Sequence, residues 1–290
     1  MEALVYLGCT VPVRNLNYEV SARKVAEALG VRLVDLPELG CCGYPLKSGD
    51  QRAALVLAAR ALAQAAATGL PLVPLCSACA GTLTEAAHHL DHDPAARGEV
   101  QAELDQLGLT YRPGVKVRHL ARFLLEEVGL EAIAGKVVRP LTGFTFAPHY
   151  GCHFLKPSRV MGGLDDPEDP RSLAQLIAVT GANALDYARL KDCCGGGVLG
   201  ADEDLAGRMA GGKLGELTAA GVTAMAVVCP FCNVMFEGQQ KAIAKRLELE
   251  IKVPVVYLTQ ILGLALGFTP DELGFKLNRI KPKELLEACK

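Results

Sequence analysis

The sequence Cys193-Cys194-Gly195-Gly196-Gly197, followed by Cys229-Pro230-Phe231-Cys232, determines how the rest of the chain is interpreted. It has an earlier counterpart in Cys41-Cys42-Gly43 and Cys76-Ser77-Ala78-Cys79. One further cysteine precedes each group, Cys152 for the later one and Cys9 for the earlier one. Ten of the 11 cysteines therefore form two sets of five, and only Cys289, in a tail that we expect to fray, lies outside them.

The residues around the earlier set predict alternating strands and helices. Hydrophobic periodicity favours strands at 3–7, 31–36, 71–75 and 115–120, and helices at 17–29, 51–68, 82–91 and 121–129. A cysteine or cysteine group follows each of the first three strands. Because ligands bind at the carboxyl ends of parallel strands, we expect the five thiols to meet at one edge of a sheet.

The second half repeats this pattern. We expect strands at 144–149, 184–187, 222–228 and 254–258, and helices at 170–181, 203–220, 233–246 and 259–267. The Cys-Cys pairs are 152 residues apart, and the matching cysteines of the two Cys-x-x-Cys groups are 153 apart. A repeat this regular predicts two similar α/β domains related by a pseudo-twofold axis, residues 1–138 and 139–290.

Composition narrows the class of protein. The 290 residues carry a net charge of −2, and 50 % of them are apolar, as in a globular protein. The small charge and the absence of Trp argue against a nucleic-acid partner. The N-terminus lacks the basic region of a signal peptide, and no apolar run approaches the ~20 residues of a membrane span. We expect a cytoplasmic protein whose cysteines act as ligands or redox groups.

Five thiols per set leave several kinds of site open. Isolated cysteines often pack in cores, but two matching sets of five favour a ligand role. Zinc needs four ligands, and adjacent thiolates such as Cys41 and Cys42 bind one tetrahedral ion poorly. They can instead reach two iron atoms of one cluster, so iron–sulfur chemistry is favoured over zinc and over a disulfide relay. The cofactor-binding glycines that we expect beside the pairs, where backbone amides can approach cluster sulfides, are Gly43, Gly195 and Gly196.

Both halves resemble the paired CCG domains of the heterodisulfide reductase HdrB family. The similarity covers nearly the whole chain and is clearest in five segments: Tyr6–Arg14, Val117–Leu120, His149–Ser158, Val228–Cys232 and Leu258–Gly267. The resemblance implies two Rossmann-like CCG domains, each with a non-cubane 4Fe–4S cluster at its strand ends. The implied metal ligands are Cys9, Cys41, Cys42, Cys76 and Cys79 for the first cluster, and Cys152, Cys193, Cys194, Cys229 and Cys232 for the second.

The resemblance also implies an activity and partners. The expected enzyme is an oxidoreductase that reductively cleaves, or in reverse forms, a disulfide or heterodisulfide between the two clusters. Its substrate would be a small disulfide or thiol, or a lipoyl-type carrier protein. Electrons would come from an HdrC-like ferredoxin-type subunit and an HdrA-like flavin subunit. The alternatives are an electron-transfer CCG protein without its own disulfide (sulfur-oxidation sHdr-like or dehydrogenase-associated) and a zinc-binding thiol scaffold.

Two residues beside Cys152 are the candidate catalytic groups. His153 is predicted to donate a proton to the leaving thiolate, because imidazole titrates near neutral pH. Lys156, like Lys47 in the first half, is predicted to hold an anionic substrate tail or to contact a partner. His119 and His149 are interpreted as packing residues.

Overall fold

Two parallel sheets form the framework of the computed structural model, which describes all 290 residues. The first has the order β2–β1–β3, with β1 at Glu2–Tyr6, β2 at Arg32–Val34 and β3 at Leu72–Pro74. The second has the order β5–β4–β6–β7, with β4 at Thr145–His149, β5 at Asn183–Ala184, β6 at Ala224–Val227 and β7 at Val255–Tyr257. In each half the first strand is central, so the predicted α/β class with a duplicated parallel arrangement is confirmed.

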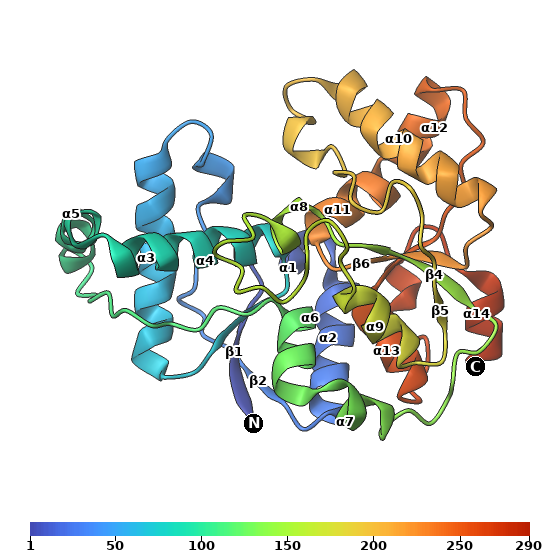
Figure 1. Cartoon of the computed structure of the whole chain (residues 1–290), viewed down its shortest axis with the longest axis horizontal. Coiled ribbons are helices and arrows are strands. Elements are labelled where there is room, and N and C mark those ends of the chain that lie inside the picture. Colours follow the sequence, from blue (N-terminus) through green and yellow to red (C-terminus); the bar gives the residue numbers. More distant parts are fainter.

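Helices connect the strands in both halves (Figure 1). Those of the first half are α1 (Val11–Arg14), α2 (Leu16–Ala28), α3 (Gln51–Thr68), α4 (Ser77–His92), α5 (Pro94–Asp105), α6 (Leu120–Phe123), a π-helical turn (Leu124–Val128) and α7 (Leu130–Ala134). Those of the second are α8 (Cys152–Leu155), α9 (Ser172–Ala178), α10 (Glu203–Ala219), α11 (Pro230–Asn233), a π-helical turn (Val234–Gly238), α12 (Gln240–Arg246), α13 (Leu258–Ala265) and α14 (Lys283–Ala288). Short 3₁₀ helices lie at Tyr44–Leu46, Gly196–Val198 and Phe275–Leu277.

Some predicted boundaries are wrong. Helix α4 begins at Ser77 and not at 82, because Cys76 in extended conformation is already its N-cap, which places Cys79 in the first turn. The strand expected at 115–120 reduces to one parallel bridge between Val117 and Leu72, because the chain enters α6 directly after His119. The equivalent strand of the second half, β7, does form.

The two halves share one core. Helix α13 of the second half packs against α2 of the first, and the rings of Tyr18 and Tyr257 stack between them with centroids 4.0 Å apart and an interplanar angle of 8°. Helix α8 likewise packs against α4, where a Cβ on Gly81 would lie 3.2 Å from His153. Buried apolar side chains of both halves form a single cluster of 76 residues, so the two halves are not separate bodies joined by a linker.

The C-terminal tail is ordered and not frayed. Helix α14 buries Leu285, and Cys289 is 1 % exposed within the same core cluster. The sequence also favours a short helical cap at residues 268–290, which α14 confirms; the expectation that the tail frays around Cys289 was wrong because the core that covers it comes from other segments. No helix in the chain combines the length and the apolar character that crossing a membrane requires.

Candidate functional site

The thiols lie at the carboxyl ends of the strands, as predicted from the sequence. Cys9 and Cys152 follow the central strands β1 and β4, and the Cys-Cys pairs follow β2 and β5. Cys76 and Cys229 are the N-caps of α4 and α11, directly after β3 and β6. The Sγ atoms of Cys76 and Cys229 are 3.8 Å apart, so the two sets meet.

Within each set the thiols are near neighbours. In the first set the thiols of Cys42 and Cys76 are close enough to that of Cys79 to raise its pKa. In the second, the thiol of Cys232 has the same relation to those of Cys194 and Cys229. Together with the contact between Cys76 and Cys229, these pairs place six buried thiols in one continuous row.

Crowding divides the thiols into acidic and weakly acidic ones. A hydrogen bond with Cys79 lowers the pKa of Cys42 to about 7, while hydrogen bonds with Cys42 and Cys76, together with burial, raise the pKa of Cys79. In the second set a hydrogen bond with Cys152 lowers the pKa of Cys193 to about 2, and one with Cys193 raises that of Cys194 to about 12. Because neighbouring thiolates repel one another, a whole set ionises only around a cationic centre.

This donor chemistry fits a polynuclear metal cluster. The sulfur atoms are soft, and those of each set influence one another's pKa, as neighbouring thiols of an iron–sulfur site would. Backbone amides also face them: the N–H of Gly43 points to Cys41 Sγ, and those of Gly195 and Gly196 point to Cys193 and Cys194 Sγ, each at 3.4 Å. No group of three or more His, Cys, Asp or Glu side chains has the arrangement of a site for a single metal ion.

The glycines after the Cys pairs have a second reason to be glycine. Gly43 has a φ of +86°, and a Cβ there would lie 2.4 Å from the carbonyl oxygen of Ala54 in α3. Gly195 has a φ of +80°, and its Cβ would lie 2.8 Å from the equivalent oxygen of Ala206 in α10. Close contact with a helix, besides the amide approach expected from the sequence, therefore requires glycine at both positions.

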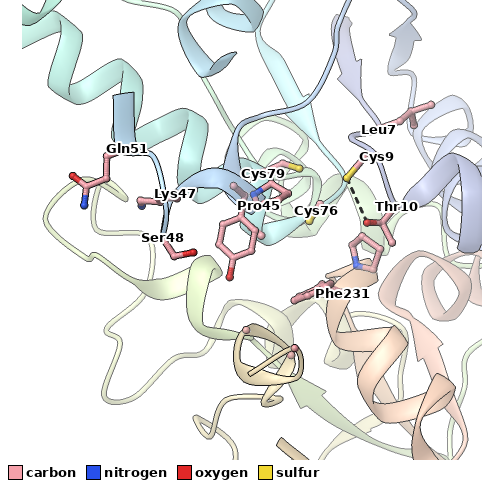
Figure 2. Close-up of a pocket in the computed structure, with 16 residues that line it drawn as sticks. Leu7, Cys9, Thr10, Pro45, Lys47, Ser48, Gln51, Cys76, Cys79 and Phe231 are labelled. Atoms are coloured by element: carbon pink, nitrogen blue, oxygen red, sulfur yellow. Dashed lines mark hydrogen bonds between the residues drawn. The ribbon is translucent and has the colours of Figure 1, made fainter. Parts of the chain in front are cut away.

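A cavity of about 580 Å³ opens between the two halves of the chain, beside the first thiol set. Cys9, Cys76 and Cys79 line it from the first half, and Figure 2 shows the side chains of Cys76 and Cys79 beside Phe231 of the second half. The other lining residues are Leu7, Thr10, Tyr44, Pro45, Lys47, Ser48, Gln51, Ala78, Gly196, Gly197, Gly200 and Pro230. The cavity is thus lined by both halves of the chain, with thiols of the first set in its wall and, on the other side, residues adjacent in sequence to Cys194 and Cys229 of the second set.

The candidate catalytic residues lie at different distances from this cavity. His153 is half-buried, with Nδ1 3.1 Å from Cys152 Sγ, but it does not line the cavity. Lys156 has a side chain 61 % exposed, with Nζ 3.9 Å from Glu168. It does not line the cavity either, so its catalytic role stays a prediction without a supporting contact. Lys47 does line the cavity and forms a 2.7 Å ion pair with Glu85.

Tyr44 is a cavity residue that the sequence did not single out. Its ring contacts the imidazole of His153 edge-on, with centroids 4.9 Å apart, and it packs against Phe231. Burial raises its pKa to about 12, so the hydroxyl keeps its proton at neutral pH. The only sign in the sequence that Tyr44 lies at the site was its position directly after Gly43, where the second half has Gly196 after Gly195.

His119 is a structural residue, as interpreted from the sequence. Its Nδ1 accepts a hydrogen bond from the N–H of Ala121, so Nε2 carries the proton and donates it to the carbonyl oxygen of Val228 at 2.8 Å. Burial lowers its pKa to about 4, which keeps the ring neutral. His119 thus ties the start of α6 to the end of β6 in the other half.

Comparison with known proteins gives consistent matches. The cysteine-rich domain family CCG matches residues 3–84 and again 146–237. The chain is 35 % identical to the B subunit of the ferredoxin/F(420)H(2)-dependent CoB-CoM heterodisulfide reductase of Methanosarcina acetivorans, over 97 % of this chain and 95 % of that protein. It is 29 % identical to an 8-methylmenaquinol:fumarate reductase membrane anchor subunit of Wolinella succinogenes, over 98 % of this chain and 99 % of that one.

A solved structure has the same fold. The crystal structure of a hypothetical protein from Helicobacter pylori superposes with a TM-score of 0.79 at 18 % sequence identity. The superposition covers 97 % of this chain and 52 % of that one, so the chain spans about half the length of the solved protein.

Proposed function

The chain belongs to the cysteine-rich CCG family and, within it, to the heterodisulfide reductase HdrB proteins, and from this premise we propose that it cleaves a disulfide in an Hdr-like complex. The observation that carries the proposal is the cavity of about 580 Å³, which has Cys9, Cys76 and Cys79 of the first set in its wall and, from the second half, residues that lie next to ligand cysteines in sequence, among them Gly196 and Pro230. A disulfide in this cavity would lie against thiols of the first set and against residues next to Cys194 and Cys229 of the second set. Reduction of an S–S bond to two thiols takes two electrons and two protons, which suits a pair of one-electron sites.

The two sets would each hold one non-cubane 4Fe–4S cluster. The ligands would be Cys9, Cys41, Cys42, Cys76 and Cys79 in a domain of residues 1–138, and Cys152, Cys193, Cys194, Cys229 and Cys232 in a domain of residues 139–290. When bound, the clusters would supply the two electrons, one from each. The amides of Gly43, Gly195 and Gly196, which face ligand sulfurs, would stabilise the charge there.

The residues of the cavity would orient the substrate and move protons. Tyr44 keeps its hydroxyl proton at neutral pH and can donate a hydrogen bond to a sulfur in the cavity. His153, in edge contact with the Tyr44 ring and hydrogen-bonded to Cys152, would resupply protons from the half-buried rim. Lys47 would attract an anionic substrate tail. HdrC-like and HdrA-like subunits would supply the electrons.

A second candidate is an electron-transfer protein without a disulfide substrate. The similarity to a protein named as a component of 8-methylmenaquinol:fumarate reductase favours it, because that name describes a reductase acting on a quinol and fumarate. In this case the thiol row would pass electrons between partner subunits, and the cavity would have no catalytic role.

One anaerobic preparation tests both candidates. Iron and sulfide analysis is expected to give about eight of each per chain, the sum for two four-iron clusters. With a reduced viologen as donor, the protein is expected to reduce small disulfides to two thiols each. Intact clusters without disulfide turnover would support the electron-transfer candidate, and zinc in place of iron would overturn both.

A further inference from the structure

A buried lysine lies behind the second thiol set. Lys213, in the middle of α10, is 0 % exposed. Its Nζ contacts His149 Nδ1 at 3.0 Å, the carbonyl oxygen of Leu190 at 3.1 Å and that of Asp192 at 2.9 Å. Each of the three ammonium protons therefore has an acceptor, and none of these acceptors is a carboxylate. The positive charge is held instead by neutral groups, one of them the backbone carbonyl directly before Cys193.

Lys213 fixes the tautomer of His149. Because Nδ1 accepts from the ammonium group, the ring proton is on Nε2. His149 is 0 % exposed, and its Nε2 is buried without any partner. A Cβ built on Gly151 would lie 3.7 Å from this Nε2 and 3.5 Å from Cys232 Sγ. Because residue 151 is glycine and has no Cβ, no side-chain atom of this residue lies between the N–H of His149 and the thiol of Cys232.

The first half lacks this arrangement. The residue equivalent to His149 is Tyr6, because each is the last residue of the first strand of its half. The residue equivalent to Lys213 is Ala61 of α3, which lies 152 residues earlier, the same spacing as between the two Cys-Cys pairs. The Tyr6 hydroxyl donates to the carbonyl oxygen of Gly40 at 2.6 Å. Gly40 precedes Cys41 as Asp192 precedes Cys193. The same backbone carbonyl is therefore bound by a neutral phenol in one half and by an ammonium group in the other.

We propose that Lys213 and His149 hold the second iron–sulfur site at a higher reduction potential than the first. Lys213 is the positioning residue: it supplies a buried positive charge and orients His149 so that Nε2–H donates to a sulfur atom of that site. Positive charge and hydrogen bonds to sulfur both favour the reduced cluster. An electron entering the pair therefore resides first at the second site. The inference rests on the proposed function, since it requires clusters in both sets.

The protonation states agree with this arrangement. Burial lowers the pKa of Lys213 to about 8, which leaves the group mainly charged at pH 7. Burial and the nearby Lys213 ammonium lower the pKa of His149 well below its usual range, so the ring is neutral and carries a single proton. The ammonium also lies 5.5 Å from the centroid of the Tyr187 ring, which stabilises a buried cation.

Anaerobic potentiometric titration followed by visible and EPR spectroscopy tests the proposal. The wild-type protein is expected to show two redox components with different reduction potentials. At any one applied potential their reduced-to-oxidised ratios should differ at least tenfold, which corresponds to a difference of about 59 mV between the two reduction potentials for one-electron sites. The double variant His149→Tyr with Lys213→Ala copies the pair found in the first half, which that half shows to be compatible with the fold. The double variant is expected to keep about eight irons. The higher of the two reduction potentials should fall, so that the reduced-to-oxidised ratio of the second site at a fixed potential drops at least tenfold.

Lys191→Met is the matched control. Lys191 lies two residues from Cys193, but its side chain is 41 % exposed and paired with Glu168, so solvent screens its charge and the potentials should not move. Lys213→Met provides a second variant with the same expected direction. Equal wild-type potentials would overturn the proposal, as would iron-replete variants with an unchanged higher potential. A wild-type chain without iron would instead refute the proposed function.

Discussion

The Sγ atom of Cys76 lies 3.8 Å from that of Cys229, although the two residues are 153 positions apart. Each caps the helix that follows the third strand of its half, so the contact joins equivalent points of the repeat. The carbonyl oxygen of Val228 accepts hydrogen bonds beside it from the side chains of Ser77 and His119, both in the first half. The thiol row is therefore held together by both halves, and a change at this contact should affect both sets.

This contact leads to different expectations for different cysteines. Cys194→Ser alters the second set away from the contact and should lower the iron content from about eight to about four per chain. Cys229→Ser alters the contact itself and should leave fewer than about four. Cys289→Ser, outside both sets, is the control and should keep about eight irons. Full iron in the Cys194 variant, measured anaerobically, would contradict the ligand assignment.

The stack of Tyr18 on Tyr257 should contribute strongly to stability. The rings are 4.0 Å apart and fully buried between α2 and α13, where the two halves pack. Tyr257→Ala leaves a cavity and should lower the free energy of unfolding by about 3–5 kcal/mol. Tyr257→Phe keeps the stacked ring and should cost less than about 1.5 kcal/mol. Urea unfolding measures both, and similar losses for the two variants would show that the stack is not the source of the stability.

Helix α3 shows which parts of the fold the sequence can predict. Its predicted range, 51–68, matches the structure because both ends carry local signals. Asp50 accepts a hydrogen bond from the N–H of Ala53, and Gly69 ends the helix with a φ of +69°. The convergence of the cysteines was predictable for a similar reason, since parallel topology brings successive strand ends to one edge.

Features that depend on distant partners could not be predicted. Lys213 is a lysine in an amphipathic helix, and such a residue is normally solvated; its burial depends on His149, 64 residues earlier. Cys289 gave no sign of burial because the core that covers it comes from other segments. The bridge at Val117 depends on its partner Leu72, 45 residues earlier, and cannot lengthen into a strand because His119 is already the N-cap of α6.

Gly43 should be irreplaceable for steric as well as conformational reasons. Gly43→Ala would place a Cβ 2.4 Å from the carbonyl oxygen of Ala54 in α3, at a φ of +86°. Gly69→Ala is the matched control, because its φ is also positive but nothing lies within 4 Å of a Cβ there. The control should lose about 1–2 kcal/mol of unfolding free energy, and Gly43→Ala should lose more. Only Gly43→Ala should also lower the iron content, since it displaces Cys41 and Cys42; equal effects would exclude the steric cause.

The last prediction concerns the charge at the cavity. Lys47 lines the cavity, and its Nζ forms an ion pair with Glu85 Oε2 at 2.7 Å. Lys156 lies outside the cavity, with its Nζ 3.9 Å from Glu168 Oε1. Lys47→Met should raise KM for a disulfide with anionic tails by about 3- to 10-fold, up to ~1.4 kcal/mol, and leave kcat unchanged. The effect is modest because Glu85 already neutralises part of the charge.

Two comparisons give this prediction its specificity. KM for an uncharged disulfide should not change in Lys47→Met, because the cavity walls remain in place. Lys156→Met should leave both substrates unaffected, because its side chain is 61 % exposed and solvent screens it. Steady-state kinetics with a reduced viologen donor measures all four combinations. If the Lys156 variant lost the anionic substrate and the Lys47 variant did not, the substrate tail would lie toward α8 and the cavity would not be its binding site.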